Sequence, residues 1–156
     1  DPQPVRQPGM TMIRDAALDD LPVLLALGEA MHAESPRYRR LSFDADRLEA
    51  TLRQLIGQVN GFVQIASDGG TVDGVMVAMV SPHWTSWDLV ATDLALYVMP
   101  DARGGHVGAR LVRAYLEWAR ERGATLVQAG VTAGIADAGR LYAACGATQC
   151  GDIWEW

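Results

Sequence analysis

The stretch DLALYVMPDARGGHVGARL, residues 93–111, decides the fold that we expect. Apolar residues up to Val98 predict a strand, Pro100 and Asp101 interrupt it, and residues 103–108 (RGGHVG) open a helix. The first N–H groups of a helix lack intrahelical partners and lie at the positive end of its dipole, and glycines let a ligand approach the backbone. The stretch therefore predicts a strand, a turn and a helix, with a site for phosphate or pyrophosphate at the turn.

The periodicity on both sides of this stretch predicts a mixed α/β chain in the order β-α-α-β-β-β-α-β-α-β. Strands are predicted over residues 10–15, 61–67, 72–81, 88–98, 125–131 and 147–156. Helices are predicted over residues 21–32 and 45–56, from the 103–108 turn to about residue 122, and over residues 135–145. We expect residues 10–156 to form a single domain, and residues 1–9, with three prolines, to be a disordered leader or a cloning remnant.

The composition is that of an ordinary globular protein, with 49% hydrophobic and 21% charged residues among 156. The net charge of −6 argues against a nucleic-acid or anionic-membrane partner, since both reward clustered cations. No apolar run approaches the roughly 20 residues of a membrane span. The two cysteines imply neither a disulfide framework nor a metal site. We expect a cytoplasmic protein without a bound metal.

Residues 103–108 resemble the acyl-CoA-binding motif Arg/Gln-x-x-Gly-x-Gly/Ala of the GNAT superfamily of N-acetyltransferases. The match consists of Arg103, Gly108 and the strand-turn-helix context, whereas His106 stands where the family usually places its first glycine. This turn and residues 34–38 look most like those of phage and prophage-encoded members.

A second segment resembles the same family. Residues 138–147 (AGRLYAACGA) are similar to its Ala-x-x-Leu-Tyr-x-x-x-Gly-Phe segment, with Ala147 in place of the phenylalanine. The family often has an asparagine where this chain has Ile135. Because the predicted order of elements is also the GNAT order, the resemblance covers nearly the whole chain from Met10.

The resemblance implies an acetyl-CoA-dependent N-acetyltransferase that moves an acyl group directly to a primary amine in a ternary complex. The acceptor would be a small-molecule or peptide amine, and a homodimer is possible. The departures at His106 and Ile135 keep an alternative open, a non-catalytic acyl-CoA-binding or regulatory domain. A nucleotide-binding α/β domain fits poorly, because the chain has no lysine for a P-loop and no Gly-x-Gly-x-x-Gly spacing.

The family resemblance also implies which residues hold the cofactor. The strand would offer main-chain groups to the pantetheine amides, and the turn and helix start would hold the pyrophosphate. These residues are Leu96, Tyr97, Val98, Arg103, Gly104, Gly105, His106, Val107, Gly108 and Ala109, with Tyr142 near the thioester sulfur. The His106 side chain either assists the phosphates or points to solvent, and Arg110 is a further phosphate candidate.

Acyl transfer from a thioester to an amine needs a proton acceptor for the ammonium and a proton donor for the thiolate. The resemblance gives Tyr142 the donor role, and an ordinary tyrosine pKa near 10 keeps it protonated at neutral pH. The alternative is a tyrosine that only packs on the sheet. Asp93 and Glu34 are the candidate bases. Asp93 is equally explained as a carboxylate paired with an arginine or a loop N–H.

The acceptor site is expected near the end of the first helix and the loop that follows the third predicted strand. Its candidate residues are His32, Glu34, His83 and Trp84. An aromatic face such as Trp84 can hold a cation or an apolar group, but Trp84, Trp87, Trp154 and Trp156 are equally explained as core or dimer surface. His83 is also explained as a residue that only lines the entrance.

Overall fold

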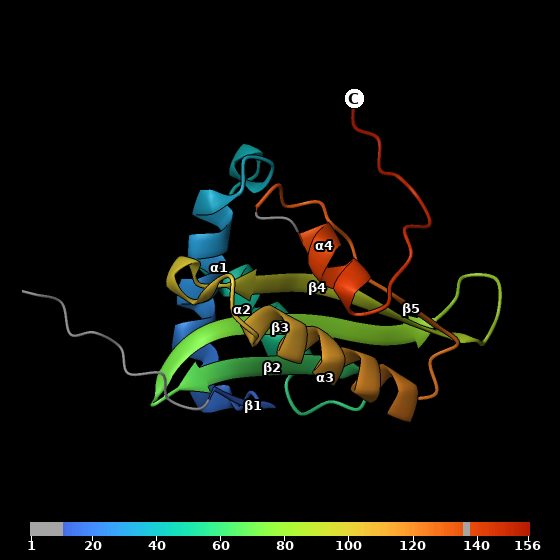
Figure 1. The fold of residues 1–156 in the computed structure, drawn as a ribbon, viewed down its shortest axis with the longest axis horizontal. Coiled ribbons are helices and arrows are strands. Elements are labelled where there is room, and N and C mark those ends of the chain that lie inside the picture. Colours follow the sequence, from blue (N-terminus) through green and yellow to red (C-terminus); the bar gives the residue numbers. More distant parts are fainter. Residues whose placement is uncertain (1–10, 136–137) are drawn as a thin grey trace, which may run out of the picture.

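The computed structural model describes residues 11–135 and 138–156, and its centre is one five-stranded sheet (Figure 1). The strands are β1 (Met12–Asp15), β2 (Gly61–Asp68), β3 (Thr71–Pro82), β4 (Leu89–Val98) and β5 (Leu126–Gln128). The helices are α1 (Leu21–Glu34), α2 (Ala45–Leu55), α3 (Val107–Glu121) and α4 (Ala138–Ala144), with short 3-10 turns η1 (Leu18–Asp20), η2 (Tyr38–Arg40) and η3 (Pro100–Ala102). The predicted leader, residues 1–9, lies outside the described residues.

The sheet has the order β1-β2-β3-β4-β5, which follows the chain. The first four strands pair antiparallel, and β5 pairs parallel with β4. The parallel pair is possible because α3 carries the chain back along the sheet between the two strands. The prediction of a mixed α/β fold is confirmed, and the structure shows that its sheet is mostly antiparallel and flanked by helices.

Helices cover both faces of the sheet, with α1 and α2 on one side and α3 and α4 on the other (Figure 1). Successive side chains of a strand point to opposite faces, so a strand covered on both sides is apolar throughout. In β3, Val75 and Val77 pack in the cluster with α1 and α2, whereas Met76 and Ala78 pack in the cluster with α3. This explains why the alternation of the central strands is weak in the sequence.

The helix α3 is held by one apolar stripe. Leu111 and Ala119 are fully buried, Tyr115 is 1% exposed, and the three lie four residues apart on one face of the helix. Truncating a buried leucine such as Leu111 to alanine costs about 2–5 kcal/mol. Since α3 packs against β3, β2 and β4, this stripe fixes the start of the helix beside the end of β4.

Two predicted strands differ from the structure. β5 has three residues instead of the predicted 125–131, and residues 147–156 form no strand, so the prediction of a final strand is wrong. Gly146, with φ of 94°, turns the chain after α4, and Glu155 near the end of the chain is held by arginines of the loop after α1. Figure 1 shows the C-terminal segment leading away from the sheet. Of the helices described here, none has the length and apolar character to cross a membrane.

Candidate active site

β4 continues beyond the end of β5 and leaves one edge of the sheet open. The pairing between the two strands ends where Thr92 faces Gln128, yet β4 runs on to Val98. Over this second half, no strand of the described chain lies beside β4 on the β5 side. Its outward main-chain groups are therefore available for a ligand rather than for a strand.

A bulge in β4 marks the place where the two strands part. Val77 pairs with Ala95 and Ala78 pairs with Asp93, so Leu94 is an extra residue without a partner in β3. Such an insertion bends the strand and increases its local twist. The bulge thus lies at the point where β4 loses its pairing with β5.

The hydrogen-bond direction along β4 selects which main-chain groups point outward. The N–H of Met99 donates to the carbonyl of Asp73 at 2.7 Å, so this group points toward β3. Because successive residues alternate, Tyr97 also turns its backbone toward β3, whereas Leu96 and Val98 turn theirs to the open edge. The geometry leaves the expected main-chain role to Leu96 and Val98 and not to Tyr97.

The turn after β4 presents backbone without side chains in front of it. Gly104 has φ of 81°, a conformation that favours glycine. A Cβ on Gly105 would meet only the carbonyl oxygen of Ala102, at 3.9 Å, so the space in front of it is open. Helical bonding begins where the N–H of Arg110 donates to the carbonyl of His106 at 3.0 Å. The N–H groups of the first turn, from Val107, Gly108 and Ala109, therefore remain for an anion.

Arg103 reaches back to β4 and α1. Its Nε donates to the carbonyl of Val98 at 2.9 Å, and its two terminal nitrogens donate to the carboxylate of Glu34 at 2.6 and 2.8 Å. The Tyr97 hydroxyl donates to the same carboxylate at 2.8 Å. The hydrogen bonds from Arg103, with smaller help from Tyr97, lower the pKa of Glu34. A carboxylate held in this way is a poor proton acceptor.

Asp93 lies at the opening between β4 and β5. Its Oδ1 accepts a hydrogen bond from the N–H of Gly130 at 2.9 Å, and the Tyr142 hydroxyl lies 3.5 Å from its Oδ2. Burial raises the pKa of Asp93, although these hydrogen bonds oppose the shift. The interpretation of Asp93 as a carboxylate bonded to a loop N–H fits this geometry, and so does a role as a base with a raised pKa.

Tyr142 points from α4 into the same opening and is 7% exposed. Burial raises its pKa, and the negative charge of Asp93 adds to this effect. Tyr142 therefore stays protonated at neutral pH and has a proton to donate. Tyr115 of α3 holds the end of β5 beside this opening, since its buried hydroxyl donates to the carbonyl of Gln128 at 2.8 Å.

The structure does not bring the four predicted acceptor residues together. His32 and Glu34 lie at the end of α1, where His32 Nε2 is 2.8 Å from the carbonyl oxygen of Leu41. His83 and Trp84 lie in the turn between β3 and β4, and Trp84 is 90% exposed. At about 3.3 Å per residue, the start of β4 next to this turn is about 26 Å from Tyr97. Only His32 and Glu34 lie near the end of β4.

A sequence model described as acetyltransferase (GNAT) family matches residues 27–147, which is more than half of the chain. The chain belongs to the GNAT acetyltransferase family. The resemblance seen in residues 103–108 and 138–147 is thereby confirmed. No curated protein sequence matches the chain significantly.

Solved structures share the GNAT fold at low sequence identity. An aminoglycoside N-acetyltransferase, AAC(6')-Iy, solved with CoA, has a TM-score of 0.78 at 15% identity, over 97% of each chain. An aminoglycoside acetyltransferase from an uncultured soil metagenomic sample, solved with sisomicin, has a TM-score of 0.72 at 20% identity, over 94% of this chain and 93% of that one. A ribosomal-protein-alanine N-acetyltransferase from Brucella melitensis has a TM-score of 0.71 at 15% identity, over 94% of this chain and 98% of that one.

GNAT enzymes use acetyl-CoA, and the described residues fit its anionic and amide parts. The open space before Gly105 and the unpaired N–H groups at the start of α3 suit a pyrophosphate. The outward groups of Leu96 and the N–H of Val98 suit amides, whereas the Val98 carbonyl already accepts from Arg103. His106 is exposed and its side chain caps nothing, so its replacement of the family glycine leaves the backbone site intact.

Two GNAT motif positions have a packing role in this structure. A Cβ on Gly108 would lie 2.9 Å from Cδ2 of Leu141, so this glycine lets α3 and α4 approach closely. Ile135 packs against the cluster formed with α1 and α2, which explains an apolar residue where the family often has asparagine. The terminal nitrogen of Arg110 donates to the carbonyl of Thr11, so it ties α3 to the start of β1.

Two residues of the site, Gly130 and Tyr115, have no sequence pattern that predicts their role. Gly130 holds Asp93 through its backbone N–H, and almost any residue type could make this contact, so the sequence does not predict it. The spacing of Tyr115 along its helix predicts a core position, and Tyr115 is indeed buried. Its hydroxyl has a second role that the spacing does not predict, because it donates to the end of β5. Among the described residues, no group of three or more His, Cys, Asp and Glu side chains could hold a metal ion.

Proposed function

We propose that this GNAT acetyltransferase transfers the acetyl group of acetyl-CoA directly to a primary amine while both substrates are bound. The observation that carries the proposal is the meeting of Asp93 and Tyr142 at the point where β5 parts from β4. The open edge of β4 and the start of α3 border the same opening. A proton acceptor and a proton donor thus stand beside a site for an elongated, anionic ligand.

The two groups suit the two proton transfers of the reaction. When bound, acetyl-CoA supplies an activated acyl carbon as a thioester. Asp93 accepts the proton that the ammonium loses to become a free amine. A C–N bond to the amine then forms as the C–S bond breaks, Tyr142 donates its proton to the sulfur of the leaving CoA, and the second proton that the nitrogen loses restores Tyr142. The raised pKa of Asp93 makes it a better base, and the raised pKa of Tyr142 keeps its proton available.

Asp93 is preferred to Glu34 as the base because their surroundings differ. Glu34 is neutralised by Arg103 and its pKa is lowered, whereas no arginine forms an ion pair with Asp93 in the described part of the chain. Two carboxylates whose pKa values are pushed in opposite directions commonly have different roles. We assign Glu34 to holding the end of β4 through Arg103, and Asp93 to the proton transfer.

Direct transfer is supported by the places of the two cysteines. Cys145 packs beside α4 in the cluster with α3, and Cys150 is exposed in the C-terminal segment. A covalent route would need a thiolate activated by a nearby base or cation, whereas Cys145 lies among apolar side chains and Cys150 is exposed.

The test is release of free CoA thiol from acetyl-CoA in the presence of a panel of amines and peptides. We expect Tyr142→Phe to lower the rate by about 100-fold or more, the usual contribution of a general acid, without changing CoA affinity measured by calorimetry. Turnover that is unchanged in Tyr142→Phe would remove this residue from the mechanism. CoA binding without turnover of any acceptor would favour the alternative, a non-catalytic acyl-CoA-binding domain.

A further inference from the structure

Residues 128–133, which we call the support segment, begin at the last paired position of β5. Gln128 ends β5 and pairs with Thr92, the residue directly ahead of Asp93. Two residues after Gln128, the N–H of Gly130 donates to Oδ1 of Asp93 at 2.9 Å. The support segment therefore brings a backbone donor to the proposed base, just beyond the place where the two strands part.

One end of the support segment is bonded to α3. The Tyr115 hydroxyl donates to the carbonyl of Gln128 at 2.8 Å. Leu111 and Ala119, one turn before and after Tyr115, are fully buried, so this hydroxyl is carried by a closely packed part of the helix. The side-chain amide of Gln128 also donates to Oγ1 of Thr92 at 3.1 Å. The end of β5 is thus held both from α3 and from β4.

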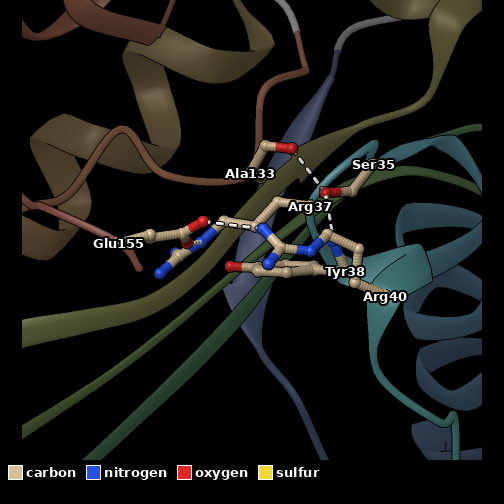
Figure 2. A network of polar contacts seen from close by, with 6 residues as sticks. All are labelled: Ser35, Arg37, Tyr38, Arg40, Ala133 and Glu155. Carbon is tan, nitrogen blue, oxygen red and sulfur yellow. Dashed lines mark hydrogen bonds and ion pairs between the residues drawn. The ribbon is translucent and has the colours of Figure 1, made fainter.

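The other end of the support segment is bonded to Ser35, which directly follows α1 (Figure 2). The Ser35 hydroxyl donates to the carbonyl of Ala133 and accepts from the N–H of Tyr38 at 3.0 Å. Ser35 is fully buried, and burial of a hydroxyl costs free energy unless the hydroxyl is hydrogen-bonded. Gly134, the next residue after Ala133, lies against Pro36, since a Cβ on this glycine would be 3.5 Å from the proline ring.

The two hydroxyls come from opposite sides of the sheet. Tyr115 belongs to the core cluster formed with α3 and α4, whereas Ser35 follows α1, whose apolar side chains pack in the cluster on the other face. Residues 128–131 are exposed and uncharged, so neither burial nor ion pairs hold this part of the chain in place. The position of the Gly130 N–H therefore depends on the two hydroxyls that bond the ends of the segment.

We propose that Tyr115 and Ser35 are positioning residues for the acetyl transfer, because their hydroxyls fix the support segment so that the Gly130 N–H holds the Asp93 carboxylate where it accepts the proton of the amine. The inference rests on the proposed function, since it concerns the base of that reaction. Each hydroxyl acts through the backbone of the support segment and not on the substrate.

The tyrosines that face Asp93 come from two helices. Tyr142 of α4 lies 3.5 Å from its carboxylate, and Tyr38 of η2 acts in turn on Tyr142. Burial and the charge of Asp93 raise the pKa of both Tyr142 and Tyr115, so these hydroxyls are neutral at neutral pH and Tyr115→Phe removes no charge. The Gly130 N–H opposes the effect of burial on the pKa of Asp93, so its withdrawal should raise this pKa further.

The first test removes the N–H itself and measures the pKa of Asp93 by ¹³C NMR titration of its carboxyl carbon. The Asp93 signal is identified by its absence in Asp93→Asn. We expect Gly130→Pro to raise the pKa by about one pH unit, the effect of losing one hydrogen bond to a charged group. Gly130→Ala is the matched control, because it keeps the N–H and its Cβ would have no neighbour closer than 3.8 Å. An equal pKa in these two variants would overturn the proposal.

The second test removes the hydroxyls. Tyr115→Phe and Ser35→Ala should each raise the pKa of Asp93 by at least about 0.3 pH unit in the same titration, and the double variant should approach Gly130→Pro. Ile65→Val is the control for lost stability, because this fully buried residue of β2 lies in the core and its truncation also weakens the fold. If the hydroxyl variants lose stability in urea denaturation but keep the pKa of Asp93, their role is structural and the proposal is refuted.

Thiol release connects the titration with the reaction. Because kcat/KM reports the pKa of the base in the free enzyme, its acid limb should move to higher pH in Tyr115→Phe and Ser35→Ala, by the amount seen in the NMR titration. If no amine gives thiol release, the proposed function fails, while the NMR titration still decides whether the hydroxyls position Asp93. If release occurs and the acid limb stays in place in both hydroxyl variants, only the present proposal fails.

Discussion

Replacing Glu34 by glutamine tests whether this carboxylate has a structural or a catalytic role. Glu34 accepts two hydrogen bonds from Arg103 and one from Tyr97, and the ion-paired side chains are 31% and 27% exposed. Exposed pairs contribute up to about 1 kcal/mol, and hydrogen bonds to charged groups about 1.5–3 kcal/mol. For a half-buried bidentate pair we take about 1.5 kcal/mol as the interaction energy.

The assay is urea denaturation of Glu34→Gln, Arg103→Gln and the double variant. We expect an interaction energy of about 1.5 kcal/mol in this double-mutant cycle, and in separate thermal unfolding a fall of about 3–6 °C in the midpoint of Glu34→Gln. Because Arg103 lowers the pKa of Glu34, the stabilisation is present above the unfolded pKa and is lost as the pH falls through the folded pKa. The stability difference should therefore shrink in acid.

The same variant should retain most of its acyl transfer, because Asp93 and not Glu34 is the proposed base. An interaction energy below about 0.3 kcal/mol, within the usual error of additivity, would show that the ion pair does not stabilise the end of β4. Loss of transfer in a Glu34→Gln protein with unchanged stability would refute the assignment and return Glu34 to the role of base.

Three further predictions concern the opening and its supports. Gly105→Glu should weaken CoA binding more than tenfold in a folded protein, because the added carboxylate faces the pyrophosphate site, whereas Gly105→Ala should bind normally in calorimetry. The kcat/KM of thiol release should fall as the pH drops through the raised pKa of Asp93, and Asp93→Asn should lack this limb and lose about 100-fold or more in rate. Leu111→Ala should lose about 2–5 kcal/mol in urea denaturation, and a loss under 1 kcal/mol would contradict the close packing of α3.

Local periodicity predicted most of the fold because the central elements have the pattern that their position demands. The strands up to β4 and the apolar stripe of α3 follow from residue spacing alone. Residues 147–156 alternate as a strand does, yet a strand also needs a partner, and Gly146 and Glu155 direct this segment elsewhere. The pairing of distant segments cannot be derived from the spacing of residues within one of them.

The candidate site was predictable in its main chain and less so in its side chains. A glycine turn before a helix leaves backbone N–H groups open to an anion in any context, so the predicted backbone site at residues 104–109 depends on the motif alone. The direction of the Arg103 side chain depends on Glu34, which is 69 positions away, and no local pattern contains that pair. His83 and Trp84 were predicted to lie at the acceptor site. The β3–β4 hairpin is long, so its turn holds both residues at the far end of the sheet.

The extra residue Leu94 reverses the side of the sheet to which the odd-numbered side chains of β4 point. Ahead of it, odd-numbered residues such as Ala91 and Asp93 face α3 and α4, and beyond it the odd-numbered Tyr97 faces α1 instead. A single strand can thus aim a proton acceptor at one layer of helices and an anchor at the other. In a regular strand Asp93 and Tyr97, four residues apart, would face the same side of the sheet, so the bulge and not the spacing of these residues separates their roles.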